Sequence, residues 1–302
     1  MVEEVKKELE RLGRKIQELE KKAGKTAPSS KKLSKKEQFS PIDVVKLARH
    51  TERPTTKDFI RLMIRDFLEL HGDRRFADDQ AIIGGIGFLG RIPVTIIGHQ
   101  KGRNVKENIL RHFGMAHPEG YRKALRLMEE AERFSRPIIN LIDTPGAYPG
   151  IGAEERGQAE AIAYNIYKMS GLKTPIISVI TGEGGSGGAL ALGVADRVFM
   201  LSNTIYSVIS PEGCAAILWK DATKAAEAAD SLRLTANDLY SMKLIDAIIP
   251  EPGDGAHTNH DETAKSLKKA LEEAIKELLD IPADDLLEQR YNKYRQMGVY
   301  IE

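Results

Sequence analysis

The stretch "TGEGGSGGALALG", residues Thr181 to Gly193, decides the fold and fits three patterns at once. A GxGxxG pattern that begins at Gly182 matches the dinucleotide-binding fingerprint. A GxSxG pattern that begins at Gly184 and centres on Ser186 matches the nucleophile elbow of hydrolases. Without either template, the stretch predicts a turn from a strand into a helix, in which glycines leave backbone amides uncovered.

The dinucleotide and hydrolase interpretations lack their accompanying residues. A dinucleotide site needs an acidic residue roughly 20 positions after the glycines, but the sequence near position 202 reads "LSNT". A hydrolase elbow needs an acid and then a histidine downstream. His257 and His260 are the only histidines after the serine, and both lie in a polar stretch. A P-loop is excluded because no Gly-Lys-Ser/Thr follows the glycines.

The third interpretation needs only the backbone. The first amides of a helix have no intrahelical acceptor, and the helix dipole adds positive potential there. Gly187 and Gly188 let a ligand approach such amides closely, as in an oxyanion hole. The alternative is that the glycines serve only a tight turn and close helix packing. A second loop, "DTPGAYPG" (143–150), follows another predicted strand and favours an anion pocket that the two loops share.

The segments around these loops repeat the order strand, glycine loop, helix. Buried strands are predicted within 136–150 and 174–188, and helices follow over 153–171 and 189–196. This repeat indicates an α/β fold with a largely parallel sheet, which binds ligands at the carboxyl ends of its strands. Other segments predict an amphipathic helix over 58–72, a hairpin over 81–100, and helices over 118–134 and 264–279.

Composition limits the class of protein. The 302 residues are 41% hydrophobic and 29% charged, which indicates a folded soluble protein with a sizeable core. The net charge of +1 favours neither nucleic acid nor a membrane as a partner. The single cysteine, Cys214, excludes an intrachain disulfide and fits a reducing, cytoplasmic compartment. The seven histidines show no HExxH spacing, so no metal is expected. No signal peptide or transmembrane helix is expected either.

Five longer motifs carry a resemblance to a known family. In chain order they read "HQKGR" (99–103), "HPEGYRKALRLM" (117–128), "LIDTPGAYPG" (141–150), "GEGGSGGALALGVAD" (182–196) and "YSVISPEGCAAILWK" (206–220). Through them, the region from Ile42 to Pro252 resembles the carboxyltransferase alpha subunits of bacterial acetyl-CoA carboxylase.

The resemblance implies a crotonase-like (ClpP/crotonase) α/β fold, a superhelix of ββα units with flanking N- and C-terminal helices. It divides the chain into three parts. Residues 1–41 are expected to form an N-terminal helix, predicted over 2–24, and a Lys-rich linker. Residues 42–252 are expected to form the carboxyltransferase domain, and residues 253–302 a helical extension.

The implied reaction moves a carboxyl group from carboxybiotin, presented by a biotin carboxyl carrier protein, to acetyl-CoA. It yields malonyl-CoA, the first committed step of fatty acid synthesis. Loss of CO2 leaves negative charge on the biotin ureido oxygen, the biotin anion takes a proton from the acetyl methyl, and the thioester enolate attacks CO2. Two oxyanions need stabilising, and no side-chain base is required. An alternative is a self-sufficient crotonase-type acyl-CoA hydratase or decarboxylase, which needs such a side chain.

The resemblance also implies partners and site residues. The partners are a beta subunit with a zinc ribbon, in an α2β2 heterotetramer, the carrier protein and biotin carboxylase, and the complete enzyme is expected to bind ATP. No cofactor is expected to be covalently bound. The amides of Gly187 and Gly188 are expected to hold the biotin ureido oxygen. Further substrate contacts are expected from Gly146, Gly150, Glu183, Gly184, Gly185, Lys101 and Arg103.

Overall fold

The computed structural model describes residues 39–298. The helix predicted over 2–24 and nearly all of the linker to residue 41 lie outside the described residues. From Phe39 onward, contacts between residues group the chain into one compact unit.

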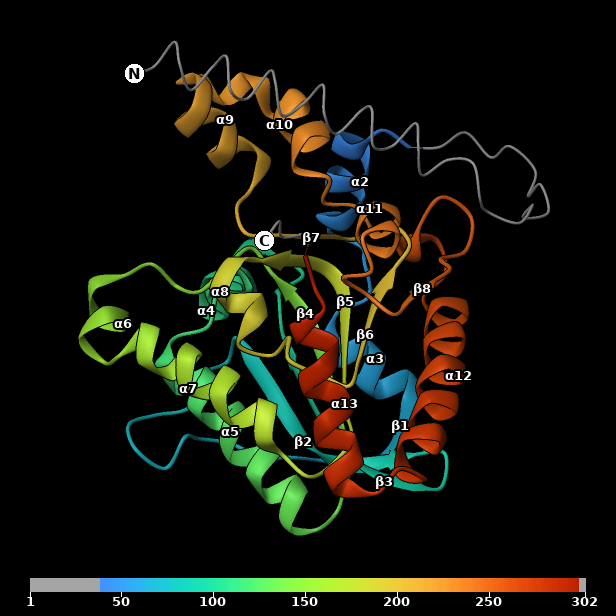
Figure 1. Cartoon of the computed structure of the whole chain (residues 1–302). Coiled ribbons are helices and arrows are strands. Elements are labelled where there is room, and N and C mark those ends of the chain that lie inside the picture. The colour runs from blue at the N-terminus through green and yellow to red at the C-terminus, as the bar shows by residue number, and fades with distance from the viewer. Residues whose placement is uncertain (1–38, 299–302) are drawn as a thin grey trace, which may run out of the picture. The chain divides into compact units, whose positions relative to one another are not determined.

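A mixed sheet of eight strands lies at the centre of this unit (Figure 1). The strand order is β1-β2-β3-β4-β5-β6-β8, and β7 pairs with the end of β5. The first three strands are antiparallel, and every other pairing is parallel. The strands are β1 (Ile64–Glu69), β2 (Ile82–Leu89), β3 (Ile92–His99), β4 (Ile138–Thr144), β5 (Ile176–Gly185), β6 (Arg197–Leu201), β7 (Ile205–Ser207) and β8 (Ala247–Ile249).

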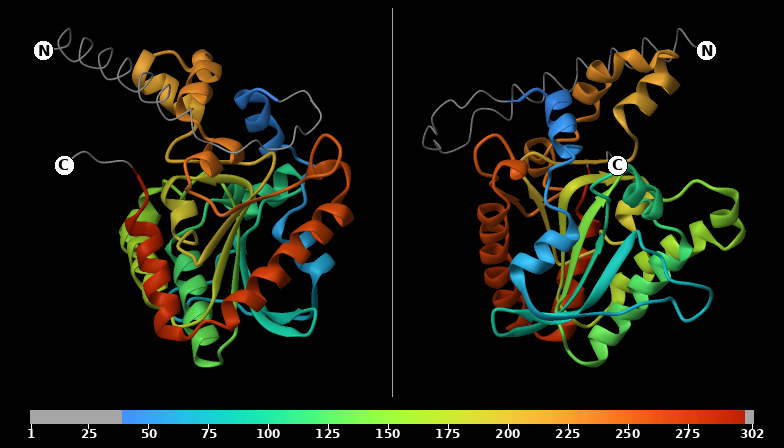
Figure 2. Two further views of the ribbon diagram at one scale, coloured as in Figure 1. Left: turned by 45° about the vertical axis from the view of Figure 1, so that its right-hand side comes forward. Right: turned by 180° about the vertical axis from the view of Figure 1, so that it is seen from behind.

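Helices cover both faces of the sheet, with α5 and α7 on one face and α3 and α12 on the other (Figure 2). The helices of the described residues are α2 (Pro41–Ala48), α3 (Thr56–Met63), α4 (Val105–Leu110), α5 (Pro118–Arg133), α6 (Ile151–Glu155), α7 (Gln158–Gly171), α8 (Ser186–Leu190), α9 (Pro211–Trp219), α10 (Ala225–Leu232), α11 (Ala236–Ser241), α12 (His260–Leu279) and α13 (Ala283–Arg295). Short 3-10 turns lie at His112–Gly114, Ala222–Lys224 and Ala256–Thr258.

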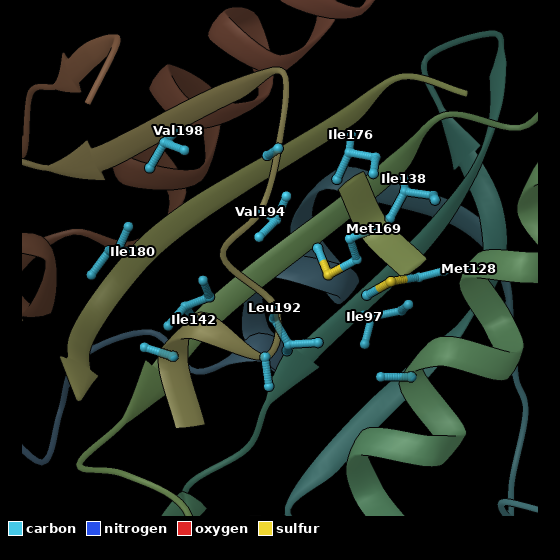
Figure 3. Packing of buried hydrophobic residues seen from close by; sticks show 14 of the residues in the cluster. Ile97, Met128, Ile138, Ile142, Met169, Ile176, Ile180, Leu192, Val194 and Val198 are labelled. Carbon is cyan, nitrogen blue, oxygen red and sulfur yellow. The ribbon is translucent and has the colours of Figure 1, made fainter. Parts of the chain in front are cut away.

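The central strands β4 and β5 are rich in apolar residues because both of their faces are buried. In β4, Ile138 and Ile142 belong to one core and Ile139 to the other, as the alternation of side chains along a strand requires. Figure 3 shows the first core, where Met128 of α5 and Met169 of α7 pack near the isoleucines of β4. These buried strands hold the glycine loops at their carboxyl ends, at one edge of the sheet.

The helix predicted over 58–72 is wrong in its second half. Helix α3 ends at Met63, and the chain continues as β1, which pairs antiparallel with β2. The register shifts between Arg65 and Leu68, where Asp66 adopts a left-handed φ of 51°. The free edge of β2 offers backbone partners, and this pairing overrides the helical spacing of the apolar residues. The hairpin over 81–100 and the helix over 118–134 are confirmed as β2–β3 and α5.

Two helix boundaries also differ from the prediction. The helix expected over 153–171 is divided into α6 and α7 at Gly157, whose φ is 82°. The helix expected over 189–196 begins earlier, at Ser186, and ends at Leu190. The glycines of the "GGSGG" run therefore belong partly to the end of β5 and partly to the first turn of α8.

Helix α13 is attached to the sheet through a buried ion pair. The side chain of Arg290 is 1% exposed, and its Nε lies 2.8 Å from Oδ1 of Asp196, just before β6. The same guanidinium donates to the carbonyls of Met169, Leu172 and Thr174, so its donors are well satisfied. The C-terminal helix is thus fixed beside the end of α7 and the start of β6.

Candidate functional site

The two glycine loops meet at the carboxyl ends of β4 and β5, as predicted. Helix α8 begins directly after β5, and its N-cap residue, Gly185, has no side chain that could accept the first amides of the helix. Ser186 adopts a left-handed φ of 49°, which turns the chain sharply from strand to helix. The amides of this first turn, including that of Gly187, therefore have no acceptor within their own helix.

Close packing of the two loops explains several of the glycines. A Cβ atom at Gly188 would lie 2.5 Å from the carbonyl carbon of Gly146. One at Gly185 would overlap the carbonyl oxygen of Pro145, and Gly184 is similarly restricted by β7. At these three positions glycine is needed for space, whether or not a ligand binds.

Gly187 is different, because its packing does not require glycine. A Cβ atom there would meet only the side chain of Ile162, at 3.6 Å, which is an ordinary van der Waals distance. Gly187 and Ser186 line one end of a cavity of about 370 Å³. The other lining residues are mostly apolar: Leu190, Gly193, Val198, Tyr206, Ser207, Val208, Leu239, Leu244, Tyr294 and Met297. The volume suits a small organic group, and residues of the first turn of α8 form part of its lining.

A larger cavity, of about 760 Å³, lies between α13 and the start of β6. It shares Leu244 and Met297 with the apolar cavity. Its walls include the paired charges of Arg290 and Asp196. We assign the chemistry to the smaller cavity because that one includes the first turn of α8.

The loop over 143–150 has at least one of its amides engaged within the protein. The amide of Gly146 donates to Oγ1 of Thr144 at 3.1 Å, so this donor is already engaged. Gly146 itself has a φ of 156° and no atom within 4 Å of a hypothetical Cβ, so it leaves open space. A Cβ atom at Gly150 would overlap the ring of Tyr148, which folds over that position. Gly146 therefore offers open space beside the first turn of α8 rather than a free amide.

A charged cluster lies beneath the loops. Nζ of Lys101, after β3, lies 2.7 Å from Oδ1 of Asp143 and 2.9 Å from Oε2 of Glu183. The amide of Glu183 also donates to Oδ1 of Asp143, at 2.9 Å. Burial by itself would raise the pKa of Glu183, but the charges of Lys101 and Arg49 outweigh it and the pKa is lowered. Lys101 and Glu183 thus brace the loops as an ionised pair.

Arg49, for which no motif in the sequence predicts a role, completes this cluster. Its Nε donates to Glu183 and its Nη1 to Glu212, both at 2.7 Å. The residue follows α2, and Glu212 lies in the first turn of α9. No local spacing could reveal this contact, because 134 positions separate Arg49 from Glu183.

Arg103 lies apart from the loops. Its guanidinium pairs with Asp58 and donates to the carbonyls of Thr51 and Arg53, at 3.0 and 2.9 Å. The structure therefore brings Lys101 and Glu183 together with the glycines, while the donors of Arg103 are committed to the α2–α3 connection.

The two histidines that follow Ser186 in the sequence, His257 and His260, make contacts elsewhere in the protein. His257 stacks on His50 at 4.1 Å between ring centroids, and Nε2 of His260 lies 2.7 Å from the carbonyl of Glu52. Among the described residues, no hydrogen bond joins a histidine to Ser186. The left-handed serine resembles a hydrolase elbow in its backbone alone, because the partner that would activate its hydroxyl is not in place.

In the described part of the chain, no helix is long and apolar enough to cross a membrane.

Comparisons with known proteins identify the family of the chain. The sequence model of the family described as "Acetyl co-enzyme A carboxylase carboxyltransferase-like" matches residues 1–298. A carboxyl transferase subunit alpha of acetyl-coenzyme A carboxylase from Alkaliphilus oremlandii is 60% identical over 264 residues, which cover 87% of this chain and 84% of that protein. Its namesake from Geobacter sulfurreducens is 59% identical over 264 residues, covering 87% and 83%.

Solved structures show the fold. A Pseudomonas malonate decarboxylase hetero-tetramer, in complex with coenzyme A, contains a chain that matches with a TM-score of 0.59 and 19% identity, covering 73% of this chain and 89% of that one. Likeness of this kind confirms the predicted crotonase-like α/β fold. The chain belongs to the acetyl-CoA carboxylase carboxyltransferase family, as alpha-subunit relatives of 60% identity and a family match over residues 1–298 establish.

Proposed function

We propose that this chain is the alpha subunit of a carboxyltransferase that moves a carboxyl group from carboxybiotin to acetyl-CoA and forms malonyl-CoA. Among the residues of the site, the surroundings of Gly187 support this proposal most strongly. Its glycine identity has no packing explanation, and it lies in the first turn of a helix at the edge of an apolar cavity. The names of the alpha-subunit relatives support the same reaction.

The backbone of α8 supplies the main catalytic interaction in this proposal. Negative charge develops on the ureido oxygen of biotin when the carboxyl group leaves. The amide of Gly187, with that of Gly188 beside it, donates hydrogen bonds to this oxygen. Preorganised donors in a site that excludes water stabilise such charge strongly. The apolar cavity beside Ser186 accommodates the uncharged part of the bound group.

The remaining predicted residues take supporting roles. Lys101 and Glu183 hold the two loops together as an ion pair, and Gly184 and Gly185 let the loops pack closely. Gly146 forms a wall of the site. Gly150 and Arg103 are engaged within the protein and are proposed to act only through the position of their loops.

The proposed enzyme is active only as an assembly. The name of the relatives implies a beta subunit as partner. We propose an α2β2 heterotetramer in which the beta subunit carries a zinc ribbon and stabilises the acetyl-CoA enolate, while the carrier protein presents biotin. ATP binding is assigned to the biotin carboxylase, since this sequence contains no P-loop.

The chemistry is proposed to lie within residues 42–252, with 253–302 as a helical extension and 1–41 as a separate N-terminal part. The absence of cysteine pairs fits a cytoplasmic enzyme.

The test is an assay of the purified chain with and without the beta subunit, using malonyl-CoA as carboxyl donor and biotinylated carrier protein as acceptor. Carboxyl transfer that appears only on mixing supports the proposal. Hydration or decarboxylation of an acyl-CoA by the chain alone would instead support the self-sufficient crotonase-type enzyme. No transfer from an assembled complex would contradict the proposed function.

A further inference from the structure

Three metal-binding side chains converge outside the glycine site. They are Asp79, ahead of β2, His112, in the 3-10 turn after α4, and His117, at the start of α5. One ligand atom from each lies within 4.8 Å of the other two. Nδ1 of His112 is 3.7 Å from Oδ1 of Asp79, and Nδ1 of His117 is 4.0 Å from Oδ2. These separations are too long for hydrogen bonds but close to those between ligands of one metal ion.

The carboxylate of Asp79 is held in a fixed orientation. Its side chain is 2% exposed. Oδ1 accepts the amide of Ala81 at 2.8 Å, and Oδ2 accepts the amide of His117 at 2.7 Å. Each oxygen keeps a further lone pair, so the two backbone bonds orient the carboxylate and leave it able to coordinate an ion.

The turn that carries His112 has an unusual backbone conformation. His112 and Phe113 both have left-handed φ angles, of 48° and 57°, and Gly114 follows with 81°. Such runs are uncommon for residues with side chains and are often found at functional sites. The turn brings the ring of His112 to 4.3 Å from that of His117, centroid to centroid.

Buried polar atoms beside this cluster have no partner. Nδ1 of His112 is inaccessible and makes no hydrogen bond within the described residues. The hydroxyl of Tyr121, one turn further along α5, is likewise buried without a partner. Buried polar groups are normally satisfied, so two such groups around one carboxylate call for an additional ligand.

We propose that Asp79, His112 and His117 form a binding site for a divalent transition-metal ion, with zinc as the favoured occupant. Two imidazoles and one carboxylate are a typical ligand set for zinc, and they leave at least one coordination position for water. The partial exposure of His112 and His117, 34% and 15%, provides a route for the ion. Tetrahedral zinc with bonds of about 2.0–2.1 Å places its ligand atoms about 3.3 Å apart, so ligand atoms that now lie up to 4.8 Å apart must close by at most about 1.5 Å, through rotation of the imidazoles, to complete the site.

The site contacts the loop over 143–150. The ring of His117 stacks on Tyr148 at 4.1 Å, and the amide of Tyr148 donates to the carbonyl of Ala116 at 3.1 Å. A bound ion would fix His117 and, through it, this loop. The inference does not depend on the proposed carboxyl transfer, because metal binding is measured on the chain alone.

The test is a titration of the purified full-length chain, without an affinity tag and freed of metal by chelation, with zinc chloride in a calorimeter. We expect one zinc ion per chain. H112Q and H117Q should each weaken binding about tenfold or more, as the loss of a ligand requires. Cobalt(II) should give the visible absorption of a site with nitrogen and oxygen ligands in the wild type and lose it in H117Q.

His71 supplies the matched control. It lies at the surface with Nδ1 3.0 Å from Asp78 and 3.9 Å from Glu69, so it mimics an adventitious site. H71Q should bind zinc like the wild type. Melting curves in chelator will verify that every variant is folded. No stoichiometric binding, or binding that H71Q weakens as much as H117Q does, would overturn the proposal.

Discussion

Gly188 lies where the two glycine loops pack against each other. There is no room for a side chain at this position. A Cβ atom there would come within 2.5 Å of the backbone of Gly146 and 2.7 Å of that of Ala147. Backbone cannot move aside as a flexible side chain can. Packing therefore accounts for this glycine even before any ligand is considered.

Gly188→Ala is accordingly expected to lower the free energy of unfolding by about 1–3 kcal/mol, as overpacking typically does. Denaturant unfolding followed by circular dichroism measures the change. The matched control is Gly171→Ala at the end of α7, where a Cβ would meet nothing within 4 Å. If both variants were equally stable, the close crossing of the loops would be refuted.

The pair of Lys101 and Glu183 gives a second prediction at the residue scale. Lys101→Met removes the cation between two carboxylates, and a loss of about 2 kcal/mol or more in unfolding free energy is expected. In the double variant with Glu183→Gln the losses should not add, with a coupling of about 1 kcal/mol or more. Unfolding of the two single variants and the double variant measures this coupling, and additive losses would show that the pair does not brace the loops.

At the scale of residues, the sequence predicts the turn whose backbone amides lack an acceptor in their helix. It does not predict the side chains around that turn. Gly187 was identified because its motif is contiguous in the chain. The role of Arg49 depends on a contact with Glu183 across 134 positions, which only the folded sheet brings together. The roles of individual glycines also depend on what lies opposite, as Gly187 and Gly188 show by differing although they are adjacent.

At the scale of elements, buried strands with glycine loops were the easiest to predict. β4 and β5 are rich in isoleucine, leucine and valine since both of their faces are covered, and this pattern is visible in the sequence. β1 was predicted as helix because its apolar residues continue the spacing of α3. Its pairing with β2 is a tertiary contact that local spacing does not encode.

The connection between α2 and α3 is attached to the end of β8 by a buried ion pair that predicts a pH dependence. Nη2 of Arg53 lies 2.6 Å from Oε1 of Glu251, and the two side chains are 3% and 0% exposed. Burial alone would raise the pKa of Glu251, but Arg53 and several hydrogen bonds outweigh it and the pKa lies below its ordinary value of 4.5. The folded protein thus holds this proton less tightly than the unfolded chain.

The stabilisation from Glu251 is therefore fully present above about pH 4.5 and is lost as the pH falls through the lower folded-state pKa. Glu251→Gln should reduce stability at neutral pH and flatten the decline in unfolding free energy below pH 4.5. Denaturant unfolding across this range measures the slope. Glu273→Gln, at a surface pair 3.9 Å from Lys269, is the control and should leave the slope unchanged. An unaltered slope in Glu251→Gln would contradict the prediction.

At the scale of the whole molecule, the parallel sheet places two loops from distant segments side by side and leaves one helix terminus open at a cavity. The class of fold followed from the repeated strand, loop and helix. The crotonase-like arrangement followed from family resemblance, because composition and spacing alone are equally compatible with a doubly wound sheet.

In the assembled enzyme, we propose, the amide of Gly187 stabilises the negative charge that develops on biotin. Replacing Gly187 by alanine keeps the amide and adds a methyl that would meet only Ile162, at 3.6 Å. Replacing it by proline removes the amide hydrogen in the first turn of a helix, where no intrahelical hydrogen bond is lost. The two variants therefore separate the hydrogen bond from the added volume.

The most direct measurement is the rate of carboxyl transfer between malonyl-CoA and biotinylated carrier in complexes reconstituted with the beta subunit, after verification that each complex assembles. We predict that Gly187→Ala loses less activity than Gly187→Pro, because it keeps the amide hydrogen and only narrows the approach of the ligand by one methyl group. Gly187→Pro should be slower by roughly 100- to 1,000-fold, the effect of losing one oxyanion donor. A correctly assembled Gly187→Pro complex that transfers carboxyl groups as fast as Gly187→Ala would contradict the account.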